Sequence, residues 1–94
     1  MADHEVRNNE AASRYEILVD GQLAGIADYV VRGDVVVLPH TEIDPSRRGT
    51  GLGAVLVRHA LDDLRATGRT VVPSCWYVAQ FIDENPDYRD LLAA

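Results

Sequence analysis

The stretch Arg47-Arg48-Gly49-Thr50-Gly51-Leu52-Gly53 decides how this chain is interpreted. It follows a β-branched run, Val35 to Ile43, and opens a helical pattern, Leu52 to Thr67. Three glycines in five positions leave out the Cβ atoms where a helix begins, so backbone N–H groups can lie directly against a ligand. Those N–H groups lack partners within the helix and carry the positive end of its dipole. Strand, glycine-rich turn and helix start together predict a phosphate-binding site, although the turn alone is equally typical of a flexible connection.

Two common phosphate-binding motifs do not fit this loop. A nucleotide P-loop needs Lys followed by Ser or Thr after its last glycine, but alanine and valine follow Gly53. A dinucleotide fingerprint needs the spacing G-x-G-x-x-G, but Gly49, Gly51 and Gly53 are evenly spaced. The pattern that fits is Arg48-x-x-Gly51-x-Gly53. It resembles the pyrophosphate loop of the GCN5-related N-acetyltransferases (GNATs), which is written Gln/Arg-x-x-Gly-x-Gly/Ala.

The resemblance extends over roughly Arg14 to Leu92 and is to the short, single-domain GNAT-like group. It also rests on His40-Thr41-Glu42-Ile43 before the loop and on Val71-Val72-Pro73-Ser74-Cys75 after the helix. It implies an α/β (α+β) GNAT-like acyl-CoA N-acyltransferase fold, and an enzyme that moves acetyl from acetyl-CoA to a small or peptidyl amine. The residues implied to bind coenzyme A are Ile43, Arg47, Arg48, Gly49, Thr50, Gly51, Leu52 and Gly53. Larger GNATs insert two helices between their first two strands, for which Asp20-Gly21 leaves no room, so the resemblance does not identify the acceptor.

Composition limits the possible functions. The 94 residues make one small domain, and no apolar run is long enough to span a membrane. The net charge is −6 and all nine basic residues are arginine, which argues against nucleic acid as a partner and favours a cationic acceptor. A single cysteine excludes an internal disulfide and favours the cytoplasm. His4 and His59 have no partner at metal-ligand spacing, so we expect no metal. We also expect a monomer or weak homo-oligomer.

The polar stretch Met1 to Ser13 has no apolar periodicity, so we expect a flexible N-terminal tail and one domain over residues 14 to 94. The rest of the pattern predicts a reduced version of the fold, with antiparallel hairpins and one parallel strand pair. The predicted elements are strands Arg14–Val19, Gln22–Arg32 and Val35–Ile43, helix Leu52–Thr67, strand Thr70–Trp76, helix Tyr77–Glu84 and a helical turn Asp87–Leu92. Within the second strand, Gly25 predicts a bulge or a close approach of another backbone.

Two prolines lie inside predicted strands, one in each member of the parallel pair. Pro39 and Pro73 cannot donate to a ladder, so each should sit where its strand is unpaired. They predict that the pair splays apart, as it does in GNATs, where the pantetheine arm of coenzyme A lies between the two strands. The alternative is that each proline marks an ordinary bulge.

Candidate catalytic residues follow from the length of the pantetheine arm. At roughly 3.3 Å per residue, about five residues of strand lead back from the loop to His40 and Glu42. Alternation places these two side chains on one face and Thr41 on the other. His40 could deprotonate an amine, and Glu42 could do so directly or through water. The alternative for His40 is a hydrogen-bonded, semi-buried histidine; for Glu42 it is a solvated carboxylate near a loop, which the sequence favours.

The leaving thiolate needs a proton source, and three residues are candidates. Cys75 should face the split across from His40, where it could accept the acetyl group, protonate the thiolate or simply pack in the core. Tyr77 and Tyr88 are alternative acids, a role that GNATs often give to a tyrosine. The rival function is a non-catalytic coenzyme A-binding or protein-interaction module, in which His40 and Cys75 are packed and closed to the cleft.

Overall fold

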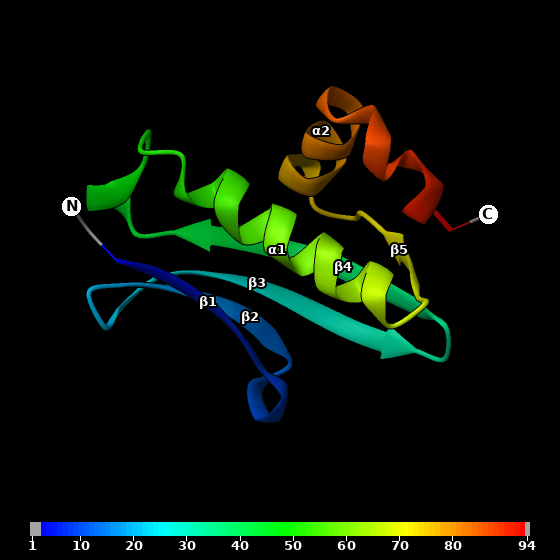
Figure 1. Ribbon diagram of the computed structural model, residues 1–94, viewed down its shortest axis with the longest axis horizontal. Coiled ribbons are helices and arrows are strands. Elements are labelled where there is room, and N and C mark those ends of the chain that lie inside the picture. The colour runs from blue at the N-terminus through cyan, green and yellow to red at the C-terminus, as the bar shows by residue number, and fades with distance from the viewer. Residues whose placement is uncertain (1–2, 94) are drawn as a thin grey trace.

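The computed structural model describes residues 3 to 93. Over these residues, one five-stranded sheet runs in chain order and α1 lies across one of its faces (Figure 1). The strands are β1 (His4–Asn9), β2 (Arg14–Val19), β3 (Gln22–Arg32), β4 (Val35–Ile43) and β5 (Thr70–Val72). The helices are α1 (Leu52–Ala66) and α2 (Trp76–Glu84), with 3₁₀ turns at Glu10–Ala12, Pro45–Arg47 and Pro86–Leu91. Neighbouring strands are antiparallel except β4 and β5, which are parallel as predicted.

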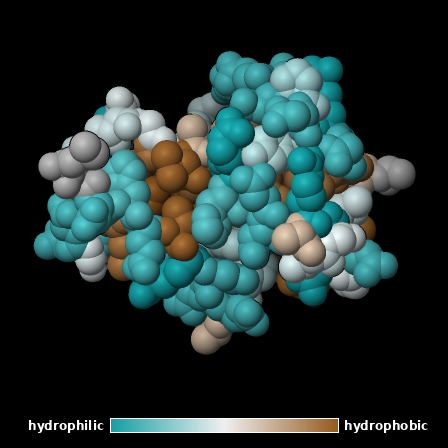
Figure 2. All heavy atoms as spheres, viewed as in Figure 1, coloured by the Kyte–Doolittle hydropathy of each residue, from teal (hydrophilic) through white to brown (hydrophobic). Residues whose placement is uncertain are grey.

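The hydrophobic core lies between the sheet and the two helices. The predicted apolar stripe of α1 is buried along its whole length, from Gly53 to Leu64. Tyr15, Ile17 and Val19 form the buried face of β2 beneath it, as alternation predicted. Outside the core the surface in Figure 2 is mostly hydrophilic, in keeping with 26% charged residues, and is interrupted by an apolar patch. No helix within residues 3 to 93 is both long and apolar enough to cross a membrane.

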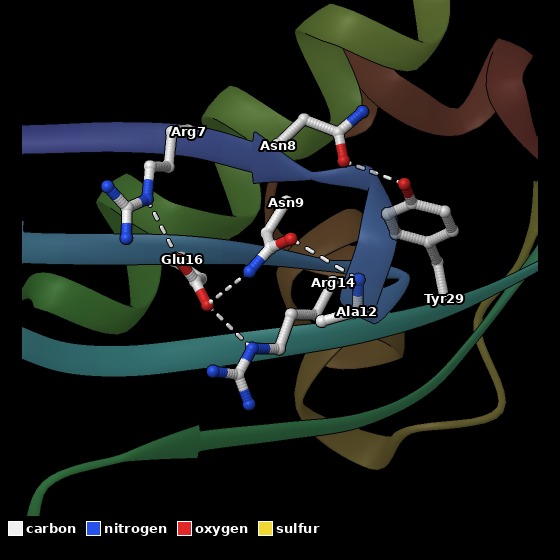
Figure 3. A network of polar contacts seen from close by, with 7 residues as sticks. All are labelled: Arg7, Asn8, Asn9, Ala12, Arg14, Glu16 and Tyr29. Atoms are coloured by element: carbon white, nitrogen blue, oxygen red, sulfur yellow. Dashed lines mark hydrogen bonds and ion pairs between the residues drawn. The ribbon is translucent and has the colours of Figure 1, made fainter.

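The prediction of a flexible N-terminal tail is wrong for most of that segment, because β1 pairs with β2 from His4 to Asn9. Polar side-chain contacts hold β1 against β2, so the sequence of this strand has no apolar periodicity that would predict it. The Glu16 side chain of β2 is 3% exposed and accepts hydrogen bonds from Arg7 Nε (2.9 Å), Asn9 Nδ2 (3.1 Å) and Arg14 Nε (2.7 Å) (Figure 3). The bond from Arg7, then those from Asn9 and Arg14, lower the pKa of Glu16 to about 2. The first two residues of the predicted tail lie outside the described range.

The β2–β3 hairpin has the predicted turn and the predicted irregularity. Asp20 and Gly21 have φ of 50° and 81°, the positive values that a two-residue hairpin turn requires. The register then shifts by one residue beside Gly25, so β3 carries a bulge there. A Cβ on Gly25 would lie 2.9 Å from the Glu42 carbonyl oxygen, so the close approach is also confirmed.

Strand β5 is shorter than predicted, and this difference opens the sheet. Its pairing with β4 ends at Val37 and Val72, before either proline, so the expected separation near Pro39 and Pro73 is confirmed. Beyond the prolines the Cys75 N–H donates to the Leu38 carbonyl oxygen at 2.9 Å, and the chain turns directly into α2. Among residues 3 to 93, no strand therefore lies beside the Pro39 to Ile43 edge of β4 on the β5 side, and α2 begins one residue earlier than predicted.

Candidate cofactor and acyl-transfer site

A cavity of about 660 Å³ lies along the open edge of β4, between the loop that begins α1 and the first turn of α2. Its lining contains most of the residues that the sequence singled out. The lining residues are His40, Thr41, Glu42, Ile43, Arg47, Arg48, Gly49, Gly51, Leu52, Gly53, Trp76 and Tyr77. Thr50 and Cys75, both predicted site residues, are not among them. The Thr50 hydroxyl instead donates to the Arg47 carbonyl oxygen within the loop, at 2.5 Å.

The glycine loop has the backbone shape that an anion site requires. Gly49 and Gly51 have φ of 80° and 84°, and Gly51 is the N-cap of α1 without any side-chain cap. The helix makes its first internal bond from the Val55 N–H to the Gly51 carbonyl oxygen, so the N–H groups before Val55 have no partner within α1. These N–H groups are at the positive end of the helix dipole. The loop therefore favours a negatively charged group, and Arg47 and Arg48 add positive charge beside it.

The two motif glycines serve different purposes. A Cβ on Gly51 would meet no atom within 4 Å, so glycine is needed there for the positive φ alone. A Cβ on Gly53 would lie 2.6 Å from the Tyr77 hydroxyl oxygen, so glycine is needed there to admit the Tyr77 ring. Tyr77 thus joins the start of α2 to the start of α1 and forms part of the cavity wall. Burial, together with the charge of Glu84, raises the pKa of the Tyr77 phenol.

A bulge in β4 controls which side chains reach each face of the sheet. His40 pairs with Asp28 but Val37 pairs with Val30, so two residues of β4, Leu38 and Pro39, lie opposite a single residue of β3. As a result, the side chains of β4 beyond the bulge lie on the opposite faces from those that an unbroken alternation would give them.

Beyond the bulge, Thr41 pairs with the buried Ala27, which places it on the helix-covered face. His40 and Glu42 share the opposite face, as alternation between neighbours predicted, with His40 Nε2 3.6 Å from Glu42 Oε2. Their side chains are 55% and 60% exposed.

Cys75 lies next to Thr41, so the prediction that it faces His40 across the split is wrong. Cys75 is 7% exposed, and its thiol donates to the Thr41 hydroxyl oxygen at 3.7 Å. Burial raises the pKa of the Cys75 thiol, but the Val78 N–H, the Thr41 side chain and the Tyr77 N–H favour the thiolate, outweigh burial and lower the pKa overall. Cys75 is the N-cap of α2, so these two N–H groups belong to the first turn of the helix that it begins.

Tyr88 is not in the cavity, so the structure removes it as a candidate acid. Tyr88 is 3% exposed. Its hydroxyl donates to Asp62 at 2.7 Å and accepts from Arg58 at 3.2 Å. Its ring packs against Phe81, with 5.8 Å between the ring centroids. Tyr88 therefore attaches the C-terminal turn to α1 and α2. Within residues 3 to 93, no group of three or more His, Cys, Asp or Glu is placed to hold a metal ion.

Sequence reasoning missed two residues of the cavity. Thr41 was placed on the face opposite His40 and Glu42 but was given no role. Trp76 was assigned to the end of a strand, although it is the first residue of α2 and lines the cavity. The early stop at Pro73 was the available signal for Trp76, since a strand that ends there leaves room for a helix to begin sooner.

A sheet whose one parallel pair opens beside a glycine-rich helix start defines an α/β domain of the acyl-CoA N-acyltransferase class. The family model for the GCN5-related N-acetyl-transferases matches residues 14–91. The chain belongs to this family and carries a GNAT-type N-acetyltransferase domain.

Known proteins resemble the chain in sequence and in fold. Protein NATD1 of Bos taurus is 36% identical over 52 residues, and that of Homo sapiens is 35% identical; each match spans 55% of this chain and 46% of the relative. The chain thus matches about half the length of these relatives. The solved ribosomal-protein-alanine N-acetyltransferase from Escherichia coli is 25% identical, with a TM-score of 0.64 over 78% of this chain and 50% of that one. A GCN5-like protein from Staphylococcus aureus shares the fold at 18% identity, with a TM-score of 0.74 over 100% and 92% of the two chains.

Proposed function

We propose that the chain is an acetyl-CoA-dependent N-acetyltransferase that transfers acetyl to a small or peptidyl amine. The observation that carries the proposal is the open edge of β4, which runs along a cavity that ends at the glycine loop. The pyrophosphate of acetyl-CoA would lie on the N–H groups from Gly49 to Gly53, beside the two arginines. The pantetheine amides would bond to the open edge of β4 in place of a strand.

The acyl group would then lie near His40 and Glu42, since about five residues of strand at roughly 3.3 Å each match the reach of the pantetheine arm. The amine nitrogen attacks the thioester carbonyl carbon, and the C–S bond breaks. The proton released from the amine goes to Glu42 or His40, directly or through water. The departing thiolate takes a proton from Tyr77, whose hydroxyl is in the cavity wall, or from the Cys75 thiol.

Cys75 offers a second route in which the acetyl group is transferred twice. Its thiolate would attack the thioester carbonyl carbon, release coenzyme A and hold the acetyl group as a thioester. The amine would then attack that carbonyl carbon, take the acetyl group and release the Cys75 thiolate. The helix N–H groups and Thr41 that lower the pKa of Cys75 support this route. The burial of the sulfur opposes it, because the thiol has to be reached from a cavity that it does not line.

The burial of Cys75 also favours a second candidate function, a coenzyme A-binding module without transferase activity. One experiment distinguishes the two functions. Mass spectrometry of the protein with acetyl-CoA and a mixture of amines should detect an acetylated amine under the first proposal. Saturable acetyl-CoA binding with no acetylated product would support the module.

We further propose that the protein acts in the cytoplasm as a monomer or weak homo-oligomer, without nucleic acid or membrane as a partner, because of its acidic charge and single cysteine.

The test of the binding site is Gly51→Val, measured by calorimetry with acetyl-CoA. Valine is strained at the φ of 84° and adds a side chain where the phosphate must approach, so binding should be lost. Gly33→Val is the matched control, because Gly33 has a φ of 64° in the turn before β4, open space around its Cβ position and no place in the cavity. Equal affinity in the two folded variants would remove the basis of the proposal.

A further inference from the structure

The two edges of the sheet differ in how the chain covers them. Beside β5, the Ala93 N–H donates to the Val71 carbonyl oxygen at 2.9 Å and Leu92 forms a bridge to Val71, so the C-terminal residues cover that edge. Strand β1 forms the other edge, and within residues 3 to 93 no strand pairs with its outer side (Figure 1). An uncovered edge presents backbone N–H and C=O groups with which another strand can pair.

The pairing of β1 with β2 determines which backbone groups of β1 point outward. The Asp20 N–H donates to the Asp3 carbonyl oxygen at 3.0 Å, so these two residues form a hydrogen-bonded pair. Such pairs alternate with non-hydrogen-bonded pairs along an antiparallel ladder, and the register of β1 on β2 is unbroken from His4 to Asn9. The backbone groups of the odd-numbered residues therefore point toward β2, and those of the even-numbered residues point outward. The outward residues are His4, Val6 and Asn8.

The side chains of β1 carry opposite charges on either side of Val6. Glu5 and Arg7 are both exposed, and alternation places them on the sheet face away from α1. Arg7 and Arg14 both bond the one carboxylate of Glu16, which leaves positive charge on Arg7, and the Arg7 bond uses only Nε. The terminal guanidinium nitrogens of Arg7 can therefore bond a second carboxylate. Val6 is half-buried on the helix-covered face, where it packs against the core.

We propose that β1 pairs antiparallel with β1 of a second copy of the chain, across a two-fold axis at Val6. Outward-pointing residues must meet outward-pointing residues, which leaves registers centred on Glu5, on Val6 or on Arg7 near the middle of the strand. A centre at Glu5 or at Arg7 sets two like charges directly opposite each other, which is destabilising. A centre at Val6 sets Glu5 of each copy opposite Arg7 of the other, and the two Val6 residues exchange both of their backbone hydrogen bonds.

The pairing makes a weak dimer that leaves the cavity free. One strand on one strand buries less than the roughly 1,200 Å² of a standard interface, and the net charge of −6 on each copy opposes association. Of the two oligomeric states proposed above, the pairing therefore selects the weak homo-oligomer. Strands β2 and β3 separate β1 from β4, so the cavity stays open in both copies and the dimer does not depend on transferase activity.

Sedimentation velocity at rising protein concentration tests the pairing. The wild type should form dimers, and Glu5→Arg should weaken them at least tenfold, because two arginines then lie opposite each other at both ends of the pair. Glu84→Arg is the matched control, since Glu84 is an exposed glutamate at the end of α2, and its dimer should equal that of the wild type. A wild type that is monomeric at about 1 mM, or a folded Glu5→Arg variant that dimerises as tightly as the wild type, would overturn the proposal.

Oxidative cross-linking tests the register. Val6→Cys places the two new thiols directly opposite each other, with about 5.5 Å between their Cα atoms, which is within disulfide range. His4→Cys is the matched control, because it leaves the charged residues in place and sets its two thiols more than about 13 Å apart along the strands. Val6→Cys should form a disulfide-linked dimer at least tenfold faster than His4→Cys, with the wild type measuring the background from the buried Cys75. Equal rates for the two variants would refute the Val6-centred pairing.

Discussion

Gly53→Ala tests how α2 is held against the glycine loop. The GNAT motif accepts either glycine or alanine at this position, but here the space is taken by a tyrosine ring. The new methyl carbon would lie 2.6 Å from the Tyr77 hydroxyl oxygen and 2.9 Å from its Cζ. Both distances are shorter than the roughly 3.5–4.0 Å of ordinary contact, so the ring has to move by about 1 Å.

Two opposing effects set the size of the change in stability. Alanine favours the helix over glycine by up to about 1 kcal/mol, and overpacking costs about 1–3 kcal/mol. The cost should fall at the lower end, because the clashing atoms are the far end of a half-buried side chain. Gly53→Ala alone should therefore lower the free energy of unfolding by only about 0–1 kcal/mol. In a Tyr77→Ala background the methyl group has room, and the same change should be stabilising.

The informative quantity is the coupling between the two positions, which we expect to be about 1–2 kcal/mol. Urea denaturation of the wild type, both single variants and the double variant measures it. Calorimetry with acetyl-CoA adds a functional readout: Gly53→Ala should bind more weakly, because the displaced ring leaves its place in the cavity wall. Changes in stability that add to within about 0.5 kcal/mol would refute the contact between Tyr77 and the loop.

Three further predictions concern the charged and polar groups. The pKa of Glu16 is lowered from 4.5 to about 2, so its contribution to stability is complete above pH 4.5 and is lost as the pH falls toward 2. Glu16→Gln should therefore be less stable than the wild type at pH 7, and its stability should decline less between pH 4.5 and pH 2 in acid denaturation. Thr41→Val should raise the pKa of Cys75 and move thiol alkylation to higher pH, and Thr41→Ser should restore the profile; an unshifted Thr41→Val profile would deny the hydrogen bond any effect. Tyr88→Phe should lower the free energy of unfolding by about 1–2 kcal/mol with unchanged acetyl-CoA affinity, and a large loss of affinity would return Tyr88 to the site.

The parts of the fold that sequence could predict are those with local signals. The α1 stripe repeats with helical spacing, and Asp20-Gly21 and Gly68 have the positive φ values that their residue types suggest. Strand β1 lacks such a signal, because it is held by Glu16, which is distant in sequence and polar. A charged residue on a strand is normally exposed, so sequence alone gives no reason to expect Glu16 to be buried.

The candidate site likewise has a part with a local sequence signal and a part without one. The shape of the glycine loop could be predicted, because a glycine-rich turn before a helix needs no knowledge of the rest of the fold. The placement of Thr41 beside Cys75 could not, because it depends on the β4 bulge, and a bulge is invisible in a strand whose side chains alternate normally on either side of it. Counting across Pro39 without the bulge would place Thr41 on the face opposite Leu38, whereas in the structure its hydroxyl lies beside the Cys75 thiol.

Pro39 connects the opening of the sheet with the placement of these side chains. It has no N–H to give to β5, and the bulge that it forms with Leu38 lets β4 remain paired with β3 up to Ile43. The same bulge turns Thr41 toward the helices, where Cys75 lies, and turns Glu42 toward solvent. Under the proposed function, the groups that would handle the thioester therefore approach the open edge from the covered face, and the carboxylate that would receive the amine proton approaches from the other. An acceptor that arrives from solvent would reach Glu42 without displacing either helix, which explains how so short a chain could do without the two inserted helices of larger GNATs.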